Sequence, residues 1–178
     1  MGRVGVPGRA RLRRVMTETG RPHYPHVHQI NVSDGGVPKK PVLEARITKT
    51  GLEGDRQQHR KVHGGPNQAV CLFSLDLIER LQDEGHWIEP GSTGENLTLA
   101  EVEWKHIVPG IVLSIGPQVR LEIKSYTAPC DLNARWFRKG DFSRISHKKY
   151  PGWSRVYAKV LRGGLVRPGD VVSVEKTD

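Results

Sequence analysis

The residues best suited to chemistry are concentrated in the stretch 51–70. It combines five glycine and proline residues with three cations, two histidines and the carboxylate of Asp55. Glycines let backbone N–H groups approach a ligand closely, and cations such as Arg56 and Lys61 attract negative charge. We therefore predict a functional loop for a small anionic ligand, with Asp55 and His63 orienting it or accepting protons. Composition leaves open the alternative of a solvated charged loop.

Cys130 is the second candidate for chemistry. It follows a predicted strand over 119–124 and comes directly after Pro129, which restricts the backbone. We expect its thiol to be partly exposed, and the thiolate is the form that attacks electrophiles or binds soft metals. A half-buried structural cysteine is the alternative. Cys71 lies in an apolar run and is predicted to be a small core residue.

A second glycine-rich turn runs over 90–97 and contains Glu95 and Asn96. Side chains of this kind often cap free backbone groups in turns. The same two side chains could instead face a ligand. The residue types alone leave both roles open.

Short strands must position these residues, because alternating apolar residues and turn residues recur along most of the chain. Strands are predicted over 26–33, 42–48, 69–73, 96–99, 112–116, 119–124, 153–161 and 166–175. One helix is predicted from the N-cap Ser74 to Glu84, and a short helix over 132–137. The pattern predicts a mainly-β fold, a closed or nearly closed β-barrel with a few helices.

The composition favours one domain with an anionic partner. A chain of 178 residues can form a core without disulfides, and 28 Lys and Arg against 19 Asp and Glu give a net charge of +9. Residues 1–24 are rich in Arg, Gly and Pro and are predicted to be a disordered or loosely attached basic extension, with the β-barrel domain over 25–178. Two cysteines, and no apolar run near the roughly 18 residues of a membrane span, predict a cytoplasmic protein without membrane contact.

Several short motifs follow one another in an order that resembles a known family. They are Gly54-Asp55-Arg56, Val62-His63-Gly64-Gly65-Pro66, Ala69-Val70, Pro90-Gly91, Gly94-Glu95-Asn96-Leu97, Ile115-Gly116, Pro129-Cys130, Gly152-Trp153 and Arg155-Val156. Together they resemble the MOSC domain, the molybdenum cofactor sulfurase C-terminal family, in its stand-alone, YiiM-like branch. The resemblance covers about 27–174 and implies a distorted closed β-barrel of the pyruvate-kinase insert type.

The resemblance also implies a ligand, the molybdenum cofactor, which is a pterin bearing an ene-dithiolate and a phosphate. The family's characteristic cysteine matches Cys130, which would supply a thiolate ligand to molybdenum. Asp55 and His63 would relay protons and, with Cys130, form the predicted catalytic set. The positions that match the family's pocket would hold the anionic cofactor; they are Arg56, Lys61, Gly64, Gly65, Glu95, Asn96 and Arg155.

The function implied by this resemblance is a molybdenum-dependent reductase that removes oxygen from small N-hydroxylated compounds. The sequence carries no cysteine cluster for an iron–sulfur site, no Rossmann fingerprint and no haem motif, so electrons are expected from a separate reductase. A carrier of sulfur, persulfide or the cofactor that uses Cys130 is the second hypothesis. The third is a basic β-barrel that binds nucleic acid, which is the least expected partner because few aromatics lie among the basic patches.

Overall fold

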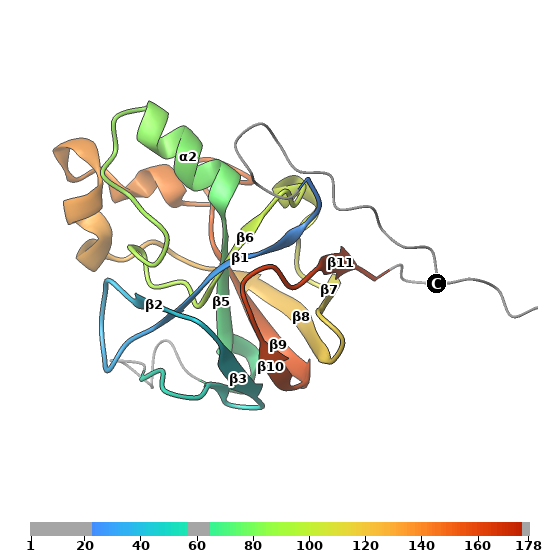
Figure 1. Cartoon of the computed structure of the whole chain (residues 1–178). Helices are drawn as coiled ribbons and strands as arrows, with labels where there is room; N and C mark the ends of the chain where they lie inside the picture. The colour runs from blue at the N-terminus through green and yellow to red at the C-terminus, as the bar shows by residue number, and fades with distance from the viewer. Residues whose placement is uncertain (1–22, 57–64, 176–178) are drawn as a thin grey trace, which may run out of the picture.

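The structure, a computed structural model, describes residues 23–56 and 65–175 of the chain. The main regular elements of this part of the chain are short strands, which are connected by turns and short helices (Figure 1). The strands are β1 (His26–Val32), β2 (Lys40–Val42), β3 (Ala45–Thr48), β4 (Gly51–Leu52), β5 (Val70–Ser74), β6 (Leu97–Ala100), β7 (Val112–Ile115), β8 (Val119–Tyr126), β9 (Val156–Arg162), β10 (Gly164–Val166) and β11 (Val172–Val174).

Two sheets surround one core. The larger sheet has eight strands in the order β11-β7-β8-β9-β5-β6-β1-β2, and the smaller has three in the order β10-β3-β4. A bridge between His26 and Val171, with a 2.9 Å hydrogen bond from Val27 N to Asp170 O, joins β1 to the residues just before β11. The two ends of the larger sheet therefore approach each other. The predicted mainly-β, barrel-like fold is confirmed, although the two sheets do not form one continuous closed ladder.

The core follows from the alternation of apolar residues along the strands. In β9, Val156, Ala158 and Val160 are almost completely buried, whereas the residues between them are less so. Successive side chains of a strand point to opposite faces, so one face of β9 packs in the core and the other faces away from it. This second face carries part of the site described below.

One α-helix connects two parallel strands. Helix α2 (Leu75–Asp83) begins after Ser74, whose side-chain oxygen accepts a hydrogen bond from Leu77 N, as the predicted N-cap requires. Its buried face contains Ile78 and Leu81. The helix leads from β5 to β6, which is parallel to β5. None of the helices within 23–56 and 65–175 is long and apolar enough to cross a membrane.

A helical cap, residues 131–145, lies beside α2 (Figure 1). It consists of three 3-10 helices, η3 (Asp131–Trp136), η4 (Arg138–Gly140) and η5 (Phe142–Ile145). The helix predicted over 132–137 corresponds to η3, whereas η4 and η5 lie beyond it, where the sequence predicts no helix. The cap is held to the domain by the buried side chains of Phe137 and Ile145. Two further 3-10 helices are η1 (Pro66–Gln68) and η2 (Trp104–His106).

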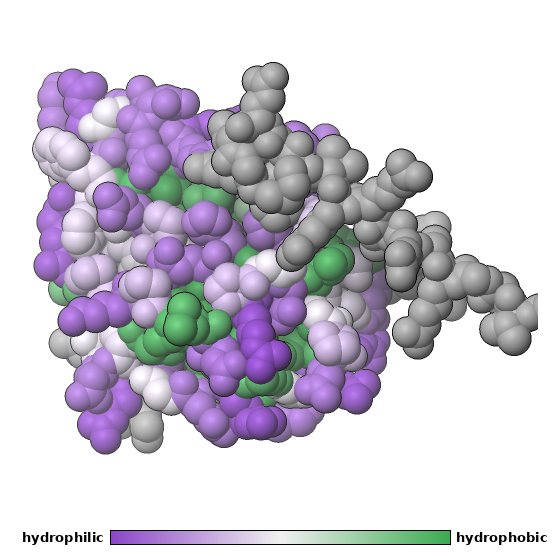
Figure 2. Space-filling model, in the orientation of Figure 1, coloured by the Kyte–Doolittle hydropathy of each residue, from purple (hydrophilic) through white to green (hydrophobic). Residues whose placement is uncertain are grey.

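The strand predicted over 42–48 is divided into two strands that belong to different sheets, β2 and β3. Leu43, in the connection between them, is 90% exposed. Figure 2 shows a hydrophobic patch in the region of β2 on an otherwise largely hydrophilic face. The chain changes sheets here, which a continuous alternation of apolar residues does not reveal.

Candidate functional site

A cavity of about 100 Å³ opens between β5, β9 and the cap. This volume holds several water molecules. Residues from six separate parts of the chain line it; they are Gly36, Val37, Lys39, Arg56, Cys71, Thr93, Gly94, Asn96, Cys130, Leu132, Asn133, Arg155 and Tyr157.

Strands β5 and β9 place three functional side chains in the wall of the cavity. Cys71 of β5 is in register with Tyr157 of β9, and residues directly opposite in an antiparallel pair project from the same face. Arg155 precedes Tyr157 by two residues, a spacing that keeps both side chains on that face. Because Val156 and Ala158 are buried in the core, this face is the one turned away from the core.

Cys130 lies in the wall at the point where the cap begins. Its burial is intermediate, which agrees with the predicted partial exposure and also with the alternative of a half-buried structural cysteine. Its thiol donates a hydrogen bond to Asp131 Oδ1, with 3.1 Å between Sγ and the oxygen. Its backbone is extended at the N-cap of η3, and its carbonyl accepts a 2.9 Å hydrogen bond from Asn133 N. The start of η3 therefore fixes the position of this thiol at the cavity.

Asp55, predicted to relay protons, does not line the cavity and is held by donors behind its wall. Its Oδ2 accepts from Lys39 Nζ at 2.5 Å and from Asn96 Nδ2 at 2.8 Å, and its Oδ1 accepts from Ser33 N at 2.9 Å. Asn96 Oδ1 in turn accepts from Cys71 N at 3.1 Å. These bonds position Lys39 and Asn96, both of which line the cavity. The proton-relay role of Asp55 stays a prediction.

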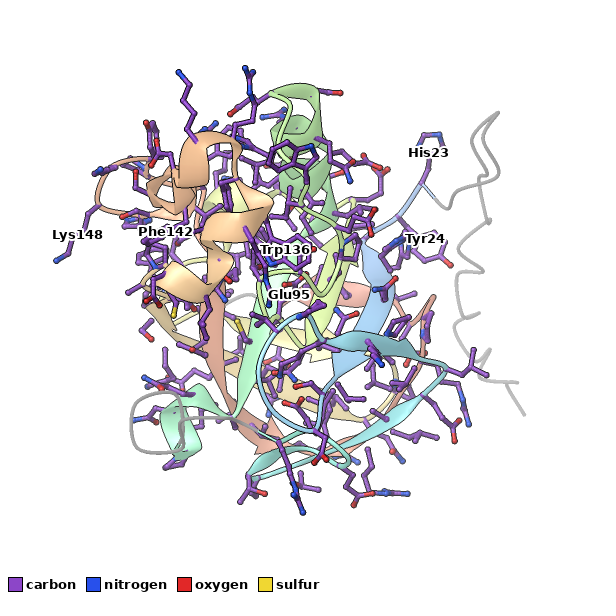
Figure 3. All side chains as sticks on the ribbon, turned by 90° about the vertical axis from the view of Figure 1, so that its left-hand side faces the viewer. His23, Tyr24, Glu95, Trp136, Phe142 and Lys148 are labelled. Carbon is purple, nitrogen blue, oxygen red and sulfur yellow. The ribbon has the colours of Figure 1, made fainter. Side chains whose placement is uncertain are left out.

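Glu95 also lies away from the cavity wall. Figure 3 shows it inside the molecule below Trp136 of the cap, whereas Lys148 projects outward. The Glu95 carboxylate is fully buried and accepts hydrogen bonds from Gly91 N, Thr93 Oγ1 and the Thr98 hydroxyl. It holds the glycine-rich turn together, and the structure does not bring it to the cavity, which Arg56, Asn96 and Arg155 do reach.

Arg155 and Arg56 reach the cavity in different states. Arg155 is 5% exposed and donates to two backbone carbonyls, those of Thr93 and Ala128. Within residues 23–56 and 65–175, its Nε has no hydrogen-bond partner and no carboxylate pairs with it. Arg56 is exposed and its Nε lies 3.3 Å from Asp34 Oδ1. Arg155 is therefore a buried cation whose charge the described residues leave unpaired.

Three predicted site residues, Lys61, His63 and Gly64, lie outside the described residues. Gly65 is described: it is exposed, precedes η1 with a φ of 112° and does not line the cavity. The predicted functional loop therefore brings only Arg56 to the cavity wall within the described part of the chain.

Sequence reasoning missed several residues of the wall, of which Cys71, Asn133 and Tyr157 are the most reactive or polar. Cys71 is buried as predicted, yet it also borders the cavity. Burial raises the pKa of its thiol, and the Arg155 guanidinium only partly opposes this effect. Burial likewise raises the pKa of Tyr157, so its phenol stays neutral. The two-residue spacing of Arg155 and Tyr157 was the one signal in the sequence that could have identified the latter.

This arrangement suits an anionic ligand that also has affinity for sulfur. The wall contains the buried guanidinium of Arg155, which no described carboxylate pairs with. It also contains the thiols of Cys71 and Cys130 and the neutral polar side chains of Asn133 and Tyr157. Charge-assisted hydrogen bonds to an oxyanion are strong in such a partly dry site. No group of three or more His, Cys, Asp or Glu side chains that could hold a metal ion occurs in residues 23–56 and 65–175.

Comparison with known proteins identifies relatives of the chain. It is 27% identical over 136 residues to the uncharacterized protein YflK of Bacillus subtilis (strain 168). The aligned region covers 75% of this chain and 60% of YflK. It is 28% identical to the protein YiiM of Escherichia coli (strain K12), over 49% of this chain and 40% of YiiM. A protein named reductase from Gibberella moniliformis is 27% identical over 70% of this chain and 22% of its own length. The chain thus spans less than two thirds of each relative.

Solved structures show the same fold at low sequence identity. YiiM from Geobacillus stearothermophilus superposes with a TM-score of 0.63 and 19% identity, covering 85% of this chain and 75% of that one. The YuaD protein of Bacillus subtilis superposes with a TM-score of 0.64 and 15% identity, covering 86% of this chain and 97% of that one. The sequence model of the MOSC domain matches residues 59–173, which is well over half of the chain. The chain belongs to the MOSC domain family.

Proposed function

We propose that the chain binds the molybdenum cofactor and reduces N-hydroxylated compounds with electrons from a separate reductase. The observation that carries this proposal is the position of Cys130, a half-buried thiol in the wall of a cavity that also contains the unpaired Arg155. A soft metal takes a thiolate ligand, and an anionic pterin phosphate needs cations. The reductase name of one relative adds support.

The residues present fit this cofactor. Cys130 would supply the protein's ligand to the metal, and Arg155 with Arg56 would hold anionic oxygens. Gly94 keeps the wall open, because a Cβ there would lie 2.9 Å from Val37 Cγ1. When bound, the cofactor supplies a centre that exchanges two electrons and an oxygen atom.

The chain's own residues would bind and orient the reactants. The overall reaction converts N–OH to N–H and water, with two electrons and two protons, so hydrogen-bond donors near the oxygen are required. Tyr157 and Cys71 keep their protons because burial raises the pKa of each. Lys39 stays fixed through its ion pair with Asp55. These groups would hold the substrate oxygen, while the cap limits access of water.

Metal content and turnover test the proposal. The full chain is purified from a host that makes the cofactor, and molybdenum per protein is measured for the wild type, Cys130→Ala and Lys148→Met, an exposed control outside the cavity. We expect Cys130→Ala to lower molybdenum retention and reduction of hydroxylaminopurine by roughly a hundredfold or more, with the control unchanged. Equal reduction by Cys130→Ala and the wild type contradicts the proposal.

A sulfur or persulfide carrier is the second candidate, and the half-buried Cys130 thiol beside a second thiol favours it. A carrier would show a reducible adduct of one sulfur atom on Cys130 in freshly purified protein and no turnover without an acceptor. Mass spectrometry of the Cys130 peptide separates the two functions.

A further inference from the structure

Asn133 stands beside Cys130 at the start of η3. Cys130 is the extended N-cap of η3, and Asn133 is the third residue of that helix. The hydrogen bond from Asn133 N to Cys130 O, 2.9 Å long, closes this turn, and both residues line the cavity. The turn thus places an amide side chain and a thiol in the wall of the same cavity.

In this turn an apolar side chain is exposed and a polar side chain is buried, the reverse of the usual arrangement. Leu132 is 46% exposed, whereas its neighbour Asn133 is 1% exposed. The Asn133 side-chain nitrogen has no hydrogen-bond partner among the described residues. Leaving such a donor buried without a partner is unfavourable, because the lost hydrogen bonds to water are not replaced. A packing role would be served better by an apolar residue, so a ligand is the more economical explanation for an amide here.

A second unpartnered donor belongs to the same cavity. Arg155 Nε also lacks a hydrogen-bond partner among the described residues, and the side chain is 5% exposed. The other two cations of the wall differ, because Lys39 is paired with Asp55 and Arg56 is exposed beside Asp34. The two unsatisfied polar atoms are both donors, and one is cationic, so their ligand must be an acceptor and is best an anion.

We propose that Asn133 and Arg155 form a donor subsite beside Cys130 that binds the oxygen atoms of a small carboxylate or oxyanion group. The subsite deepens the proposed function, on which its use in turnover rests. There Asn133 would share with Arg155 the binding of the anionic oxygens that the proposed function assigns to Arg155.

Alkylation of Cys130 tests this subsite without cofactor. Iodoacetate and iodoacetamide form the same S–C bond and release iodide, but only iodoacetate carries a carboxylate. The rates of both reactions at Cys130 are measured on the full chain by peptide mass spectrometry. The ratio of the two rates reports how strongly the site attracts the carboxylate, because both reagents react with the same thiolate fraction. A synthetic peptide of residues 127–135 is the reference, because it retains the Asp131 carboxylate next to the thiol and lacks Arg155.

We expect the iodoacetate-to-iodoacetamide ratio to be about tenfold higher in the protein than in the peptide, the size of one charge-assisted hydrogen bond. Asn133→Leu should lower the ratio about fivefold or more, with the iodoacetamide rate nearly unchanged. Asn133→Asp, which is almost isosteric, should lower it further because its carboxylate repels iodoacetate. Asn67→Leu, at an exposed position outside the cavity, should leave it unchanged.

The proposal is overturned if the wild-type ratio equals that of the peptide, or if Asn133→Asp leaves the ratio unchanged. It is also overturned if Asn133→Leu changes both rates equally, because that result reports a purely structural role. These results do not depend on molybdenum. The subsite can therefore fail while the Cys130→Ala test supports the proposed function, and the reverse also holds.

Discussion

The carboxylate of Asp55 organises the back of the cavity. It joins Lys39, Asn96 and the backbone of Ser33 through three hydrogen bonds, and the side chains of Lys39 and Asp55 are 8% and 5% exposed. Residue type and spacing single out Asp55 as a candidate site residue. They do not distinguish a proton relay from a positioning residue, because that difference depends on which donors the fold places around the carboxylate.

We predict that Asp55→Asn destabilises the protein by about 3–5 kcal/mol, since it leaves the Lys39 ammonium buried without its partner. Urea unfolding measures the loss. Asp34→Asn is the matched control, because Asp34 and Arg56 are 88% and 74% exposed and such pairs contribute about 0–1 kcal/mol. Equal losses in the two variants would show that the buried ion pair is not important for stability.

Cys71 gives the folded protein a pH dependence. Burial raises the pKa of its thiol above the ordinary value of 9.0. Above about pH 9 the unfolded chain loses this proton while the folded protein keeps it, so the unfolding free energy is full below that pH and falls as the pH rises. We predict that Cys71→Ala has a shallower fall between about pH 9 and 10 than the wild type. Parallel stability curves from urea titrations would contradict this account.

At the scale of elements, the site depends on how turns approach one another. Gly91 has a φ of 88°, and a Cβ there would lie 2.4 Å from the carbonyl oxygen of Lys39. Lys39 N donates to Gly91 O, and Gly91 N donates to Glu95. The glycine-rich turn is recognisable in the sequence, but its contact with the residues before β2 is not, because the two segments are about fifty residues apart.

We predict that Gly91→Ala is more destabilising than Gly110→Ala. Both glycines have positive φ, which costs an alanine about 1–2 kcal/mol. A Cβ added at Gly110 would meet no atom within 4 Å, whereas one at Gly91 would, so Gly91→Ala should lose a further roughly 1–3 kcal/mol from overpacking. Thermal or urea unfolding of the two variants measures the difference, and equal stability would mean that the turn moves aside without cost.

The helical cap contains short helices that sequence patterns do not predict. Its first helix is predicted from Leu132 onward, but η4 and η5 lie in a stretch for which no helix is predicted. Helices of three or four residues are too short to display a periodicity of apolar residues, and they are held by contacts such as Phe137 with the rest of the domain. The burial of Asn133 beside the exposed Leu132 follows from this tertiary packing.

At the scale of the whole molecule, one barrel-like domain presents one cavity wall built from distant segments. The net charge of +9 does not show which cation would bind an anionic ligand in this wall. That cation is the buried Arg155, which lacks a carboxylate partner among the described residues. In the part of the chain that the structure describes, other basic residues pair with carboxylates, as Arg144 does with Glu84. An overall charge therefore indicates an anionic partner but not where it binds.

The order of residues along the chain is enough to predict the mainly-β fold, the helix capped by Ser74, the family and the place of Cys130 after a strand. These features are local, since alternation, capping and motif order are written along the chain. Other features depend on the three-dimensional fold. Glu95 and Asp55 form hydrogen bonds behind the wall, and the wall itself includes Cys71, Tyr157 and Asn133. Strand register and the packing of the cap set these relations between residues far apart in the chain, and such contacts leave no periodic signal in a single sequence.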